Sequence, residues 1–411
     1  MKPSEYSTAS PRQVNQQNEG WLTRRYLSKL LSALPKLQYG TLSLFLPSGQ
    51  ELQFGEAAAG EPRAEVRLHS LKPISRLLRG GSVGWAESYM AGEWDTPDLT
   101  ALIRWGVGNE HQMEEIVGGS TLLNFINRVI HLARANTRSG SRKNIAYHYD
   151  LGNDFYKLWL DQSMTYSAAL FEQGGDLFEA QQNKYRRICK MLNIQPGETV
   201  LEIGCGWGGF AELAATEYGA QVTGITLSKE QLAYAQARIT AAGLEQKAQF
   251  HLIDYRDVDG QYDHIVSIEM FEAVGEEHWP TYFKQVKRLL KPGSSALLQI
   301  ITIANERFDA YRKSADFIQK YIFPGGMLPS PDALSRQFEQ AEMKFDESLY
   351  FGKDYAKTLA HWRHAFLAQW PRIQTQGFDE RFRRMWLYYL CYCEGGFEES
   401  SIDVGLFKIS R

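Results

Sequence analysis

From residue 181 onward, the pattern of hydrophobic and polar positions alternates between helical and strand-like periods. Short apolar runs predict strands at 199–203, 220–226, 248–253, 262–268, 295–303 and 402–409. Helical periods are expected at 181–193, 207–218, 228–242, 279–291, 355–370 and 379–395. Short connections between such elements predict an α/β fold with a doubly wound sheet.

The first third of the chain follows a different pattern. Residues 1–20 are polar and are expected to be disordered. Residues 21–34 place four leucines on one helical face beside Arg24, Arg25 and Lys29. Such a basic amphipathic helix can lie on a bilayer or pack onto its own domain, and the sequence leaves both open.

The remainder of this region predicts a small α+β domain. Residues 38–70 alternate around a Pro-Ser-Gly turn, which predicts an antiparallel sheet. Helices are expected over 72–106 and 111–135, and a basic linker with serine and glycine follows, with Arg134, Arg138, Arg142 and Lys143. We therefore divide the chain into a disordered N-terminus (1–20), an N-terminal domain with its linker (21–140) and a catalytic domain (141–411).

Charge is distributed unevenly along the chain. The net charge of -3 over 411 residues argues against a nucleic-acid-binding protein. Residues 1–143 hold 17 Lys and Arg against 13 Asp and Glu, whereas the remainder is acidic. A basic front half fits an anionic surface such as phospholipid head groups, so the N-terminal domain is expected to associate with lipid or membrane. A chance variation of surface charge would give the same count.

Cysteine spacing and hydropathy indicate the cellular context. The four cysteines form no CxxC pair and no zinc-ligand spacing, which fits a reduced compartment. No apolar run reaches the ~18 residues of a membrane span, and the polar N-terminus lacks a signal-peptide core. We expect a cytoplasmic protein that contacts the inner face of the membrane peripherally.

The stretch 199–209 carries the clearest ligand-binding signal. An apolar strand enters a turn where Gly204 and Gly206 let the backbone approach a ligand closely. The helix that follows begins with unpaired N–H groups, and Glu202 could take the ammonium group of a bound amino acid. Nucleotide-like ligands bind at this first strand-to-helix turn of a doubly wound sheet.

The next two strands indicate which ligand this is. A dinucleotide site would place an acid after the second strand, but Thr226 stands there, followed by Leu227 and Gln231. After the third strand, Asp254 and Tyr255 offer an acceptor and a ring to an adenine. These residues fit S-adenosylmethionine (AdoMet) better than NAD.

Two further segments are typical of a substrate site. Residues 305–330 interrupt the alternation after a strand, where an inserted segment can form a lid over the ligand-binding edge. Residues 144–180 crowd aromatic side chains without clean periodicity. Core packing accounts for some of these rings, and the others are candidates for a pocket lining.

Several segments, in one order, resemble the cyclopropane-fatty-acyl-phospholipid synthases and their mycolic-acid relatives. They are 147–156, 164–167, 200–209, 224–231, 254–257, 270–275 and 321–329. Residues 84–94 are similar to the small domain of the bacterial synthases, and the resemblance runs from about residue 38 to the C-terminus. It implies a class I AdoMet-dependent methyltransferase fold (a Rossmann-like sheet with helical insertions) beside the small N-terminal domain, and a homodimer.

The resemblance also implies the chemistry. In that family the π-bond of an unsaturated acyl chain attacks the sulfonium methyl group of AdoMet. The resulting carbocation loses a proton from the new methyl group and closes a cyclopropane. A cation must be kept from water, and aromatic faces stabilise it. The pocket residues expected on this ground are Tyr147, His148, Phe271, Tyr321 and Phe323.

Site roles follow residue by residue from the same resemblance. The cofactor contacts of the family fall on Tyr166, Ser167, Gly204, Gly206, Thr226 to Gln231, Asp254 and Tyr255. Its bicarbonate base is held by a Cys, a Glu, a His, an Ile backbone group and a Tyr, and the matching positions are Ala168, Glu272, Gln299, Ile301 and Tyr355. Alanine and glutamine replace the Cys and the His of this ligand set. Two kinds of base therefore stay open, and bicarbonate is one of them. The other is an acidic side chain of the protein. Glu272 could take the proton itself, with Tyr355 as a relay, and Glu269 is a second candidate for this role.

We therefore expect AdoMet-dependent methyl or methylene transfer to a double bond in an unsaturated acyl chain of membrane phospholipid, forming a cyclopropane fatty acid. A hydride shift in the cation, followed by reduction, would give a methyl-branched chain instead. Two other functions stay open at this stage. They are methyl transfer to a small soluble amine or hydroxyl, and non-catalytic lipid binding, which Ala168 and Gln299 suggest.

Overall fold

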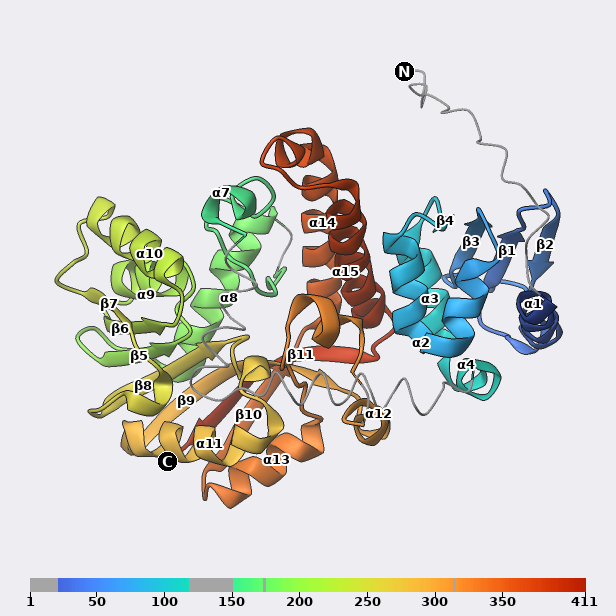
Figure 1. Ribbon diagram of the computed structural model, residues 1–411. Helices are drawn as coiled ribbons and strands as arrows, with labels where there is room; N and C mark the ends of the chain where they lie inside the picture. Colours follow the sequence, from blue (N-terminus) through green and yellow to red (C-terminus); the bar gives the residue numbers. More distant parts are fainter. Residues whose placement is uncertain (1–20, 118–150, 173–174, 314) are drawn as a thin grey trace.

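The computed structural model describes residues 21–117, 151–172, 175–313 and 315–411. Figure 1 shows a small N-terminal unit beside a larger α/β unit, each with its own sheet. The larger sheet has seven strands in the order β10-β11-β9-β8-β5-β6-β7. These are β5 (Thr199–Ile203), β6 (Gln221–Thr226), β7 (Ala248–Leu252), β8 (Tyr262–Ile268), β9 (Leu290–Ile303), β10 (Lys344–Tyr350) and β11 (Ile402–Ser410).

Strand direction follows the chain connections. Strands β5 to β9 pair in parallel, because helices carry the chain back between them. Strand β11 pairs antiparallel with both β9 and β10 at one edge of the sheet. In β5, Val200 to Ile203 are all buried, as expected for a strand covered on both faces. The α/β prediction is confirmed.

Helices cover this sheet and extend beyond it. The covering helices are α8 (Leu177–Leu192), α9 (Gly209–Glu217), α10 (Lys229–Ala241), α11 (Trp279–Leu289) and α13 (Pro331–Gln340), with the short α7 (Asn153–Tyr156) and α12 (Asn305–Tyr311). Helices α14 (Gly352–Gln374) and α15 (Glu380–Glu398) pack against each other and stand between the two units (Figure 1). Helix α13 and strand β10 lie in a region for which the sequence pattern gave no expectation.

The N-terminal unit combines a four-stranded sheet with helices. Its strands, in the order β2-β1-β3-β4, are β1 (Thr41–Phe45), β2 (Glu51–Phe54), β3 (Arg63–Leu68) and β4 (Trp94–Asp95). The prediction of an antiparallel sheet is wrong for one pair, because β1 and β3 run parallel, with Leu44 opposite Val66. The chain crosses over between them instead of turning back in a hairpin.

The helices of this unit are α1 (Trp21–Ala33), α2 (Lys72–Met90), α3 (Leu99–Gly108) and α4 (Glu110–Val117). In α1, Leu30 and Ala33 are buried, so part of its apolar face packs on its own unit. Helix α2 lies in the region 72–106 where helices are expected, and it is kinked at Gly81, whose φ is 58°. Most of the helix expected over 111–135, and the basic linker after it, lie outside the described residues.

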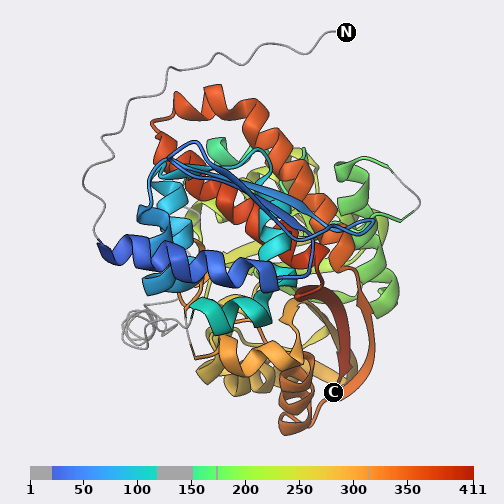
Figure 2. The same cartoon turned by 90° about the vertical axis from the view of Figure 1, so that its right-hand side faces the viewer.

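The two units are joined through α15, which packs on α3 and α2 (Figure 2). Gly395 permits this approach, because a Cβ there would lie only 2.7 Å from Ile103 Cγ2. Two polar contacts tie the same surfaces together: Arg104 Nε donates to Glu399 Oε1 at 2.6 Å, and Arg384 Nη2 to Asp95 Oδ1 at 2.7 Å. The N-terminal unit therefore packs on the larger α/β unit through a specific interface.

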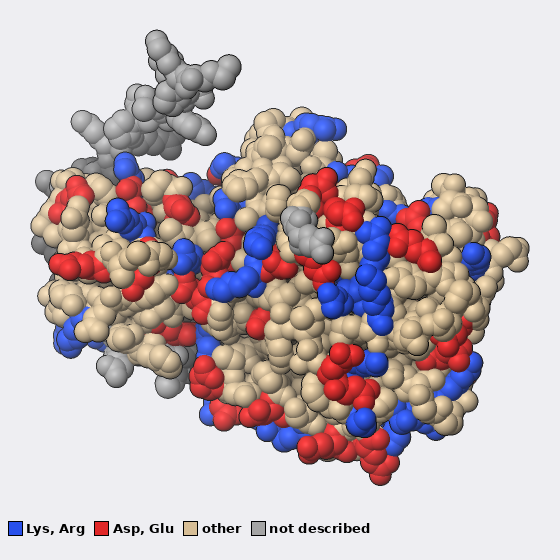
Figure 3. Space-filling model, turned by 180° about the vertical axis from the view of Figure 1, so that it is seen from behind, with Lys and Arg blue, Asp and Glu red and all other residues tan. Residues whose placement is uncertain are grey.

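The basic excess of the front half does not lie on the folded N-terminal unit. Residues 21–117 hold 10 Lys and Arg against 11 Asp and Glu, whereas residues 118–143 hold five basic residues and no acidic one. On the face opposite to that of Figure 1, acidic and basic side chains are interspersed over both units (Figure 3). Among the described helices, none combines the length and the apolar character required to span a bilayer.

Candidate functional site

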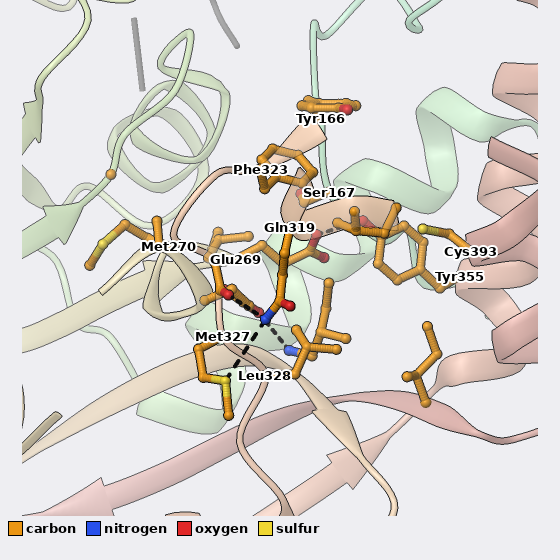
Figure 4. Close-up of a pocket in the computed structure, with 18 of the residues that line it drawn as sticks. Tyr166, Ser167, Glu269, Met270, Gln319, Phe323, Met327, Leu328, Tyr355 and Cys393 are labelled. Atoms are coloured by element: carbon orange, nitrogen blue, oxygen red, sulfur yellow. Dashed lines mark hydrogen bonds between the residues drawn. The ribbon is translucent and has the colours of Figure 1, made fainter. Parts of the chain in front are cut away.

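A cavity of about 540 Å³ lies at the carboxyl ends of β5, β6 and β8. This volume is within the ~300–1,000 Å³ of typical ligand sites. Its lining combines the glycine turn after β5, the inserted segment 305–328, and four residues of the N-terminal unit: Ser82, Val107, Glu110 and His111. Figure 4 shows Ser167 and Met270 together with Gln319 and Phe323 of the inserted segment around this space.

The glycine turn forms one wall of the cavity. Gly204 and Gly206 have φ of 83° and 52°, a region that side chains other than glycine adopt with strain. The N–H groups of Gly204 and Cys205 both donate to the carbonyl of Ile225, which fixes the turn against β6. A Cβ on Gly204 would lie 2.8 Å from Met270 Cγ. The turn therefore brings bare backbone to the cavity, as the sequence predicts.

Glu202 supplies a buried acid beside this turn. It is 3% exposed, it lines the cavity, and its Oε2 has no hydrogen-bond partner. Burial raises the pKa of this carboxyl well above its ordinary value, and the charge of Lys184 opposes that rise. An orphaned buried carboxyl group fits a cationic ligand group, such as the ammonium of a methionine moiety.

Residues after β6 and β7 form the next part of the wall. Thr226, Leu227 and Gln231 line the cavity, and the hydroxyl of Thr226 donates to Gln231 Oε1 at 2.9 Å. Tyr255 also lines it, but Asp254 does not. The carboxylate of Asp254 instead accepts two hydrogen bonds from the Arg256 guanidinium, at 2.8 and 2.6 Å.

Asp254 therefore lies beside the cavity and is paired with an arginine two residues away, and its contact with the adenine stays a prediction. The rest of the predicted cofactor set lines the cavity. A glycine-rich turn, a buried acid with an unpartnered oxygen and a half-buried tyrosine ring fit AdoMet. Glu202 would hold its amino group, the turn its methionine moiety, and Tyr255 its adenine.

Tyr166 and Ser167 also line the cavity. The hydroxyl of Tyr166 lies 2.7 Å from that of Tyr389, and Ser167 Oγ accepts a hydrogen bond of 2.6 Å from Lys184 Nζ. Lys184 is fully buried, and burial lowers the pKa of its ammonium group to about 7. In the sequence this lysine is typical of the polar face of an amphipathic helix, so pattern alone gave no signal for it.

The polar centre of the cavity is a pair of acids, Glu269 and Glu272. Glu269 Oε1 accepts from the backbone N–H of Ala168 at 2.7 Å and from Gln299 Nε2 at 2.6 Å. Its Oε2 accepts from the hydroxyl of Tyr355 at 2.6 Å. Burial raises the pKa of Glu269, whereas these donors and Lys184 act in the opposite direction.

Glu272 is held differently. Its Oε1 accepts from the backbone N–H of Ile301 at 2.6 Å, and its Oε2 is buried without a partner. Burial, and then the charge of Glu269, raise the pKa of Glu272 to about 8. The two acids therefore differ in how well the protein stabilises their ionised forms, because the donors that stabilise an anion converge on Glu269.

The residues that match the family's bicarbonate ligands divide between the two acids. Ala168, Gln299 and Tyr355 were expected to surround a bicarbonate with Glu272 and Ile301. In the structure the first three donate to the side chain of Glu269, which lies between them. Of these matched residues, only Ile301 donates to the side chain of Glu272. Ala168 and Gln299 are fully buried behind the cavity wall.

The predicted pocket rings separate into three groups. Phe323 lines the cavity. Phe271 does not line it. This ring is 1% exposed and packs among Trp279, Tyr282 and Phe283 in a hydrophobic core of the larger unit. Tyr321 also faces away, toward the N-terminal unit. Tyr147 and His148 lie outside the described residues. Rings that sequence patterns missed, Tyr389, Tyr392 and Phe397 of α15, line the cavity instead.

The inserted segment, which the sequence predicts as a lid, lines the cavity and contacts the N-terminal unit. A π-helical turn (Ile318–Ile322) presents Lys320 and Tyr321 to α2. Lys320 Nζ and the Tyr321 hydroxyl both donate to Glu87 Oε1, each at 2.7 Å. Nearby, Arg307 Nη2 donates to Glu110 Oε1 at 2.7 Å, and both residues line the cavity.

Replacing Glu87 by glutamine is expected to loosen this lid by about 1 kcal/mol, because a half-buried ion pair is lost while the Tyr321 contact can persist. Amide hydrogen exchange across 316–323 should accelerate about fivefold. Glu93→Gln is the matched control, since Glu93 pairs with Arg76 at 3.0 Å within the N-terminal unit. Equal exchange in both variants would show that Glu87 does not hold the lid.

Known proteins resemble this chain over most of its length. It matches the protein family described as mycolic acid cyclopropane synthetase over residues 136–407. It is 39% identical over 368 residues to the tuberculostearic acid methyltransferase UfaA1 of Mycobacterium tuberculosis, a match that covers 86% of this chain and 85% of that protein. It is 38% identical over 365 residues to a cyclopropane-fatty-acyl-phospholipid synthase of Escherichia coli, with 87% and 90% covered.

Solved structures resemble the catalytic unit. The cyclopropane synthase MmaA2 from Mycobacterium tuberculosis matches with a TM-score of 0.62 and 30% identity, over 66% of this chain and 98% of that one. The mycolic acid cyclopropane synthase CmaA1 complexed with SAH and CTAB matches with a TM-score of 0.62 and 32% identity, over the same shares. The class I AdoMet-dependent methyltransferase fold is confirmed, and so is AdoMet as the cofactor.

Proposed function

Because the chain belongs to the mycolic acid cyclopropane synthetase family and is an AdoMet-dependent methyltransferase of fatty acyl chains, we propose that it alkylates the double bond of an unsaturated chain in membrane phospholipid. The product is a cyclopropane fatty acid, and a methyl-branched chain is the alternative outcome of the same cation. The E. coli relative, named a cyclopropane-fatty-acyl-phospholipid synthase, supports this substrate class along nearly its whole length.

The observation that carries the proposal is the continuity of one cavity. It joins the glycine turn to an apolar wall made by Ile268, Ile301, Phe323, Met327 and Leu328. Glu269 and Glu272 lie on the same lining. A hydrocarbon chain in the apolar part would lie next to both the cofactor end and an acid, as alkene alkylation requires.

The residues of the site supply binding, shielding and proton removal. AdoMet, when bound, supplies an electrophilic methyl group on a sulfonium. The rings of Tyr166, Phe323 and Phe397 line the space where a carbocation would form, and aromatic faces stabilise positive charge. The lid residues Met327 and Leu328 help to exclude water, which would otherwise trap the cation as an alcohol. An acidic side chain takes the proton.

We place the reaction at the inner face of the membrane, with peripheral contact, and in a homodimer. The basic residues of 118–143 and their lack of acidic neighbours support contact with anionic lipid. Pelleting with vesicles that contain an anionic phospholipid, at low and high salt, tests the membrane contact. Ultracentrifugation tests the dimer.

The test of function is incubation of the full chain with AdoMet and vesicles of an unsaturated phospholipid, followed by mass spectrometry of the released fatty acids. An acyl chain heavier by one methylene supports the proposal, and proton NMR separates a cyclopropane from a methylene or methyl branch. If vesicle lipids gain no methylene mass while a soluble acceptor is methylated, the proposed substrate class is wrong.

A further inference from the structure

Three hydrogen-bond donors converge on one acidic side chain in the reaction cavity. The Ala168 N–H, the Gln299 amide and the Tyr355 hydroxyl each approach a Glu269 carboxylate oxygen at 2.6–2.7 Å. Short, charge-assisted contacts of this kind stabilise the ionised form. Lys184, buried behind Ser167, adds a positive charge that acts on the same group. These contacts favour the ionised form of Glu269 and oppose the burial that raises its pKa.

The backbone at Glu269 is strained in a way that its side chain explains. Its φ is 47°, a conformation that glycine adopts freely and that costs other residues about 1 kcal/mol or more. The residue follows directly after β8, where the chain turns beneath the cavity. The three donors hold the glutamate side chain in place. The strained backbone conformation therefore serves to position this carboxylate.

The neighbouring acid lacks these features. Glu272 has one donor, the Ile301 N–H, and one buried oxygen without a partner. With its pKa raised to about 8, it retains its proton at neutral pH and cannot accept another. Of the two acids on the cavity wall, Glu269 is therefore the one that the structure keeps ready to accept a proton.

We propose, on the basis of the proposed function, that the Glu269 carboxylate is the general base that deprotonates the alkylated acyl chain, built into the chain in place of a free bicarbonate. Ala168 donates its backbone N–H to this carboxylate, and Gln299 donates an amide N–H. A free anion such as bicarbonate would need these three hydrogen-bond donors. In this chain the side-chain carboxylate of Glu269 already accepts from all three. The enzyme then has no need of bicarbonate.

The step balances in atoms and charge. The alkene π-electrons form the new carbon–carbon bond to the transferred methyl group, and the carbon–sulfur bond breaks with its pair left on sulfur. Glu269 then takes a proton from the cationic chain. The electrons of the broken C–H bond form either the third bond of a cyclopropane ring or, after a hydride shift, a carbon–carbon double bond. The neutral acid later releases its proton to water.

The test compares Glu269→Gln and Glu269→Gly with the wild type in buffers freed of carbon dioxide. Both variants should bind AdoMet within threefold of wild type by calorimetry and turn over at least 100-fold more slowly. In the glycine variant the vacated space should admit a small anion. Added bicarbonate, formate or acetate should then restore turnover at least tenfold, and the ¹³C resonance of bicarbonate should broaden with this variant but not with wild type.

Glu342→Gly is the matched control, because Glu342 also has a left-handed backbone, with φ of 51°, but lies on the surface. It should leave turnover unchanged. The proposal is overturned if Glu269→Gln keeps more than a tenth of wild-type turnover, if no anion rescues the glycine variant, or if wild type needs bicarbonate. If wild type alkylates no acyl chain at all, the proposed function itself fails, and the base assignment fails with it.

Discussion

Replacing Glu202 by glutamine is expected to weaken AdoMet binding by about 10- to 100-fold and, at pH 7, to raise the melting temperature of the ligand-free protein. Hydrogen bonds between charged groups are worth about 1.5–3 kcal/mol, and the amide cannot neutralise an ammonium. Without ligand, burial raises the pKa of this carboxyl and one of its oxygens has no partner, so keeping the group ionised in the folded protein costs free energy. Glutamine removes that cost.

Calorimetry with AdoMet and thermal unfolding measure the two effects on the same samples. Glu230→Gln is the control, because Glu230 is exposed at the start of α10, close to the cofactor loop. It should change neither affinity nor melting temperature. Unchanged AdoMet affinity in Glu202→Gln would show that this acid does not receive the amino group. A lower melting temperature would show that it supports the fold instead.

Replacing Glu272 by glutamine is expected to make the stability of the ligand-free protein less dependent on pH. The folded-state pKa of about 8 lies above the ordinary 4.5. The protonated folded form is therefore favoured at low pH, and stability falls as pH rises from about 4.5 through 8, by up to roughly 1.4 kcal/mol per unit. Glutamine cannot ionise, so its advantage over wild type should be absent near pH 4.5 and amount to a few kcal/mol at pH 8.

Urea unfolding at pH 5, 6.5 and 8 measures this difference. Glu277→Gln, an exposed neighbour whose side chain is 61% accessible, should follow the wild-type curve. A parallel pH dependence in Glu272→Gln and wild type would contradict the raised pKa. The same variant separates the two acids in catalysis, since Glu272→Gln should retain more turnover than Glu269→Gln.

Local pattern was sufficient for the elements and for the cofactor loops. Every strand expected between 199 and 303 is present, because apolar runs bounded by turn residues require only neighbours in the sequence. Gly204 and Gly206 adopt the positive φ that their turn requires, and Thr226 stands where an acid would indicate a dinucleotide. Each of these features is encoded within about ten residues.

Tertiary structure alone decided which acid the site is built around and which rings face it. Glu269 meets Ala168 and Tyr355 across 101 and 86 residues of chain, and no local pattern relates such distant positions. Phe271 and Tyr321 fit the expected aromatic lining equally well in sequence, but helix packing turned one into the core and the other toward Glu87. The direction of a side chain depends on the packing of its element against others, which the chain fixes only when folded.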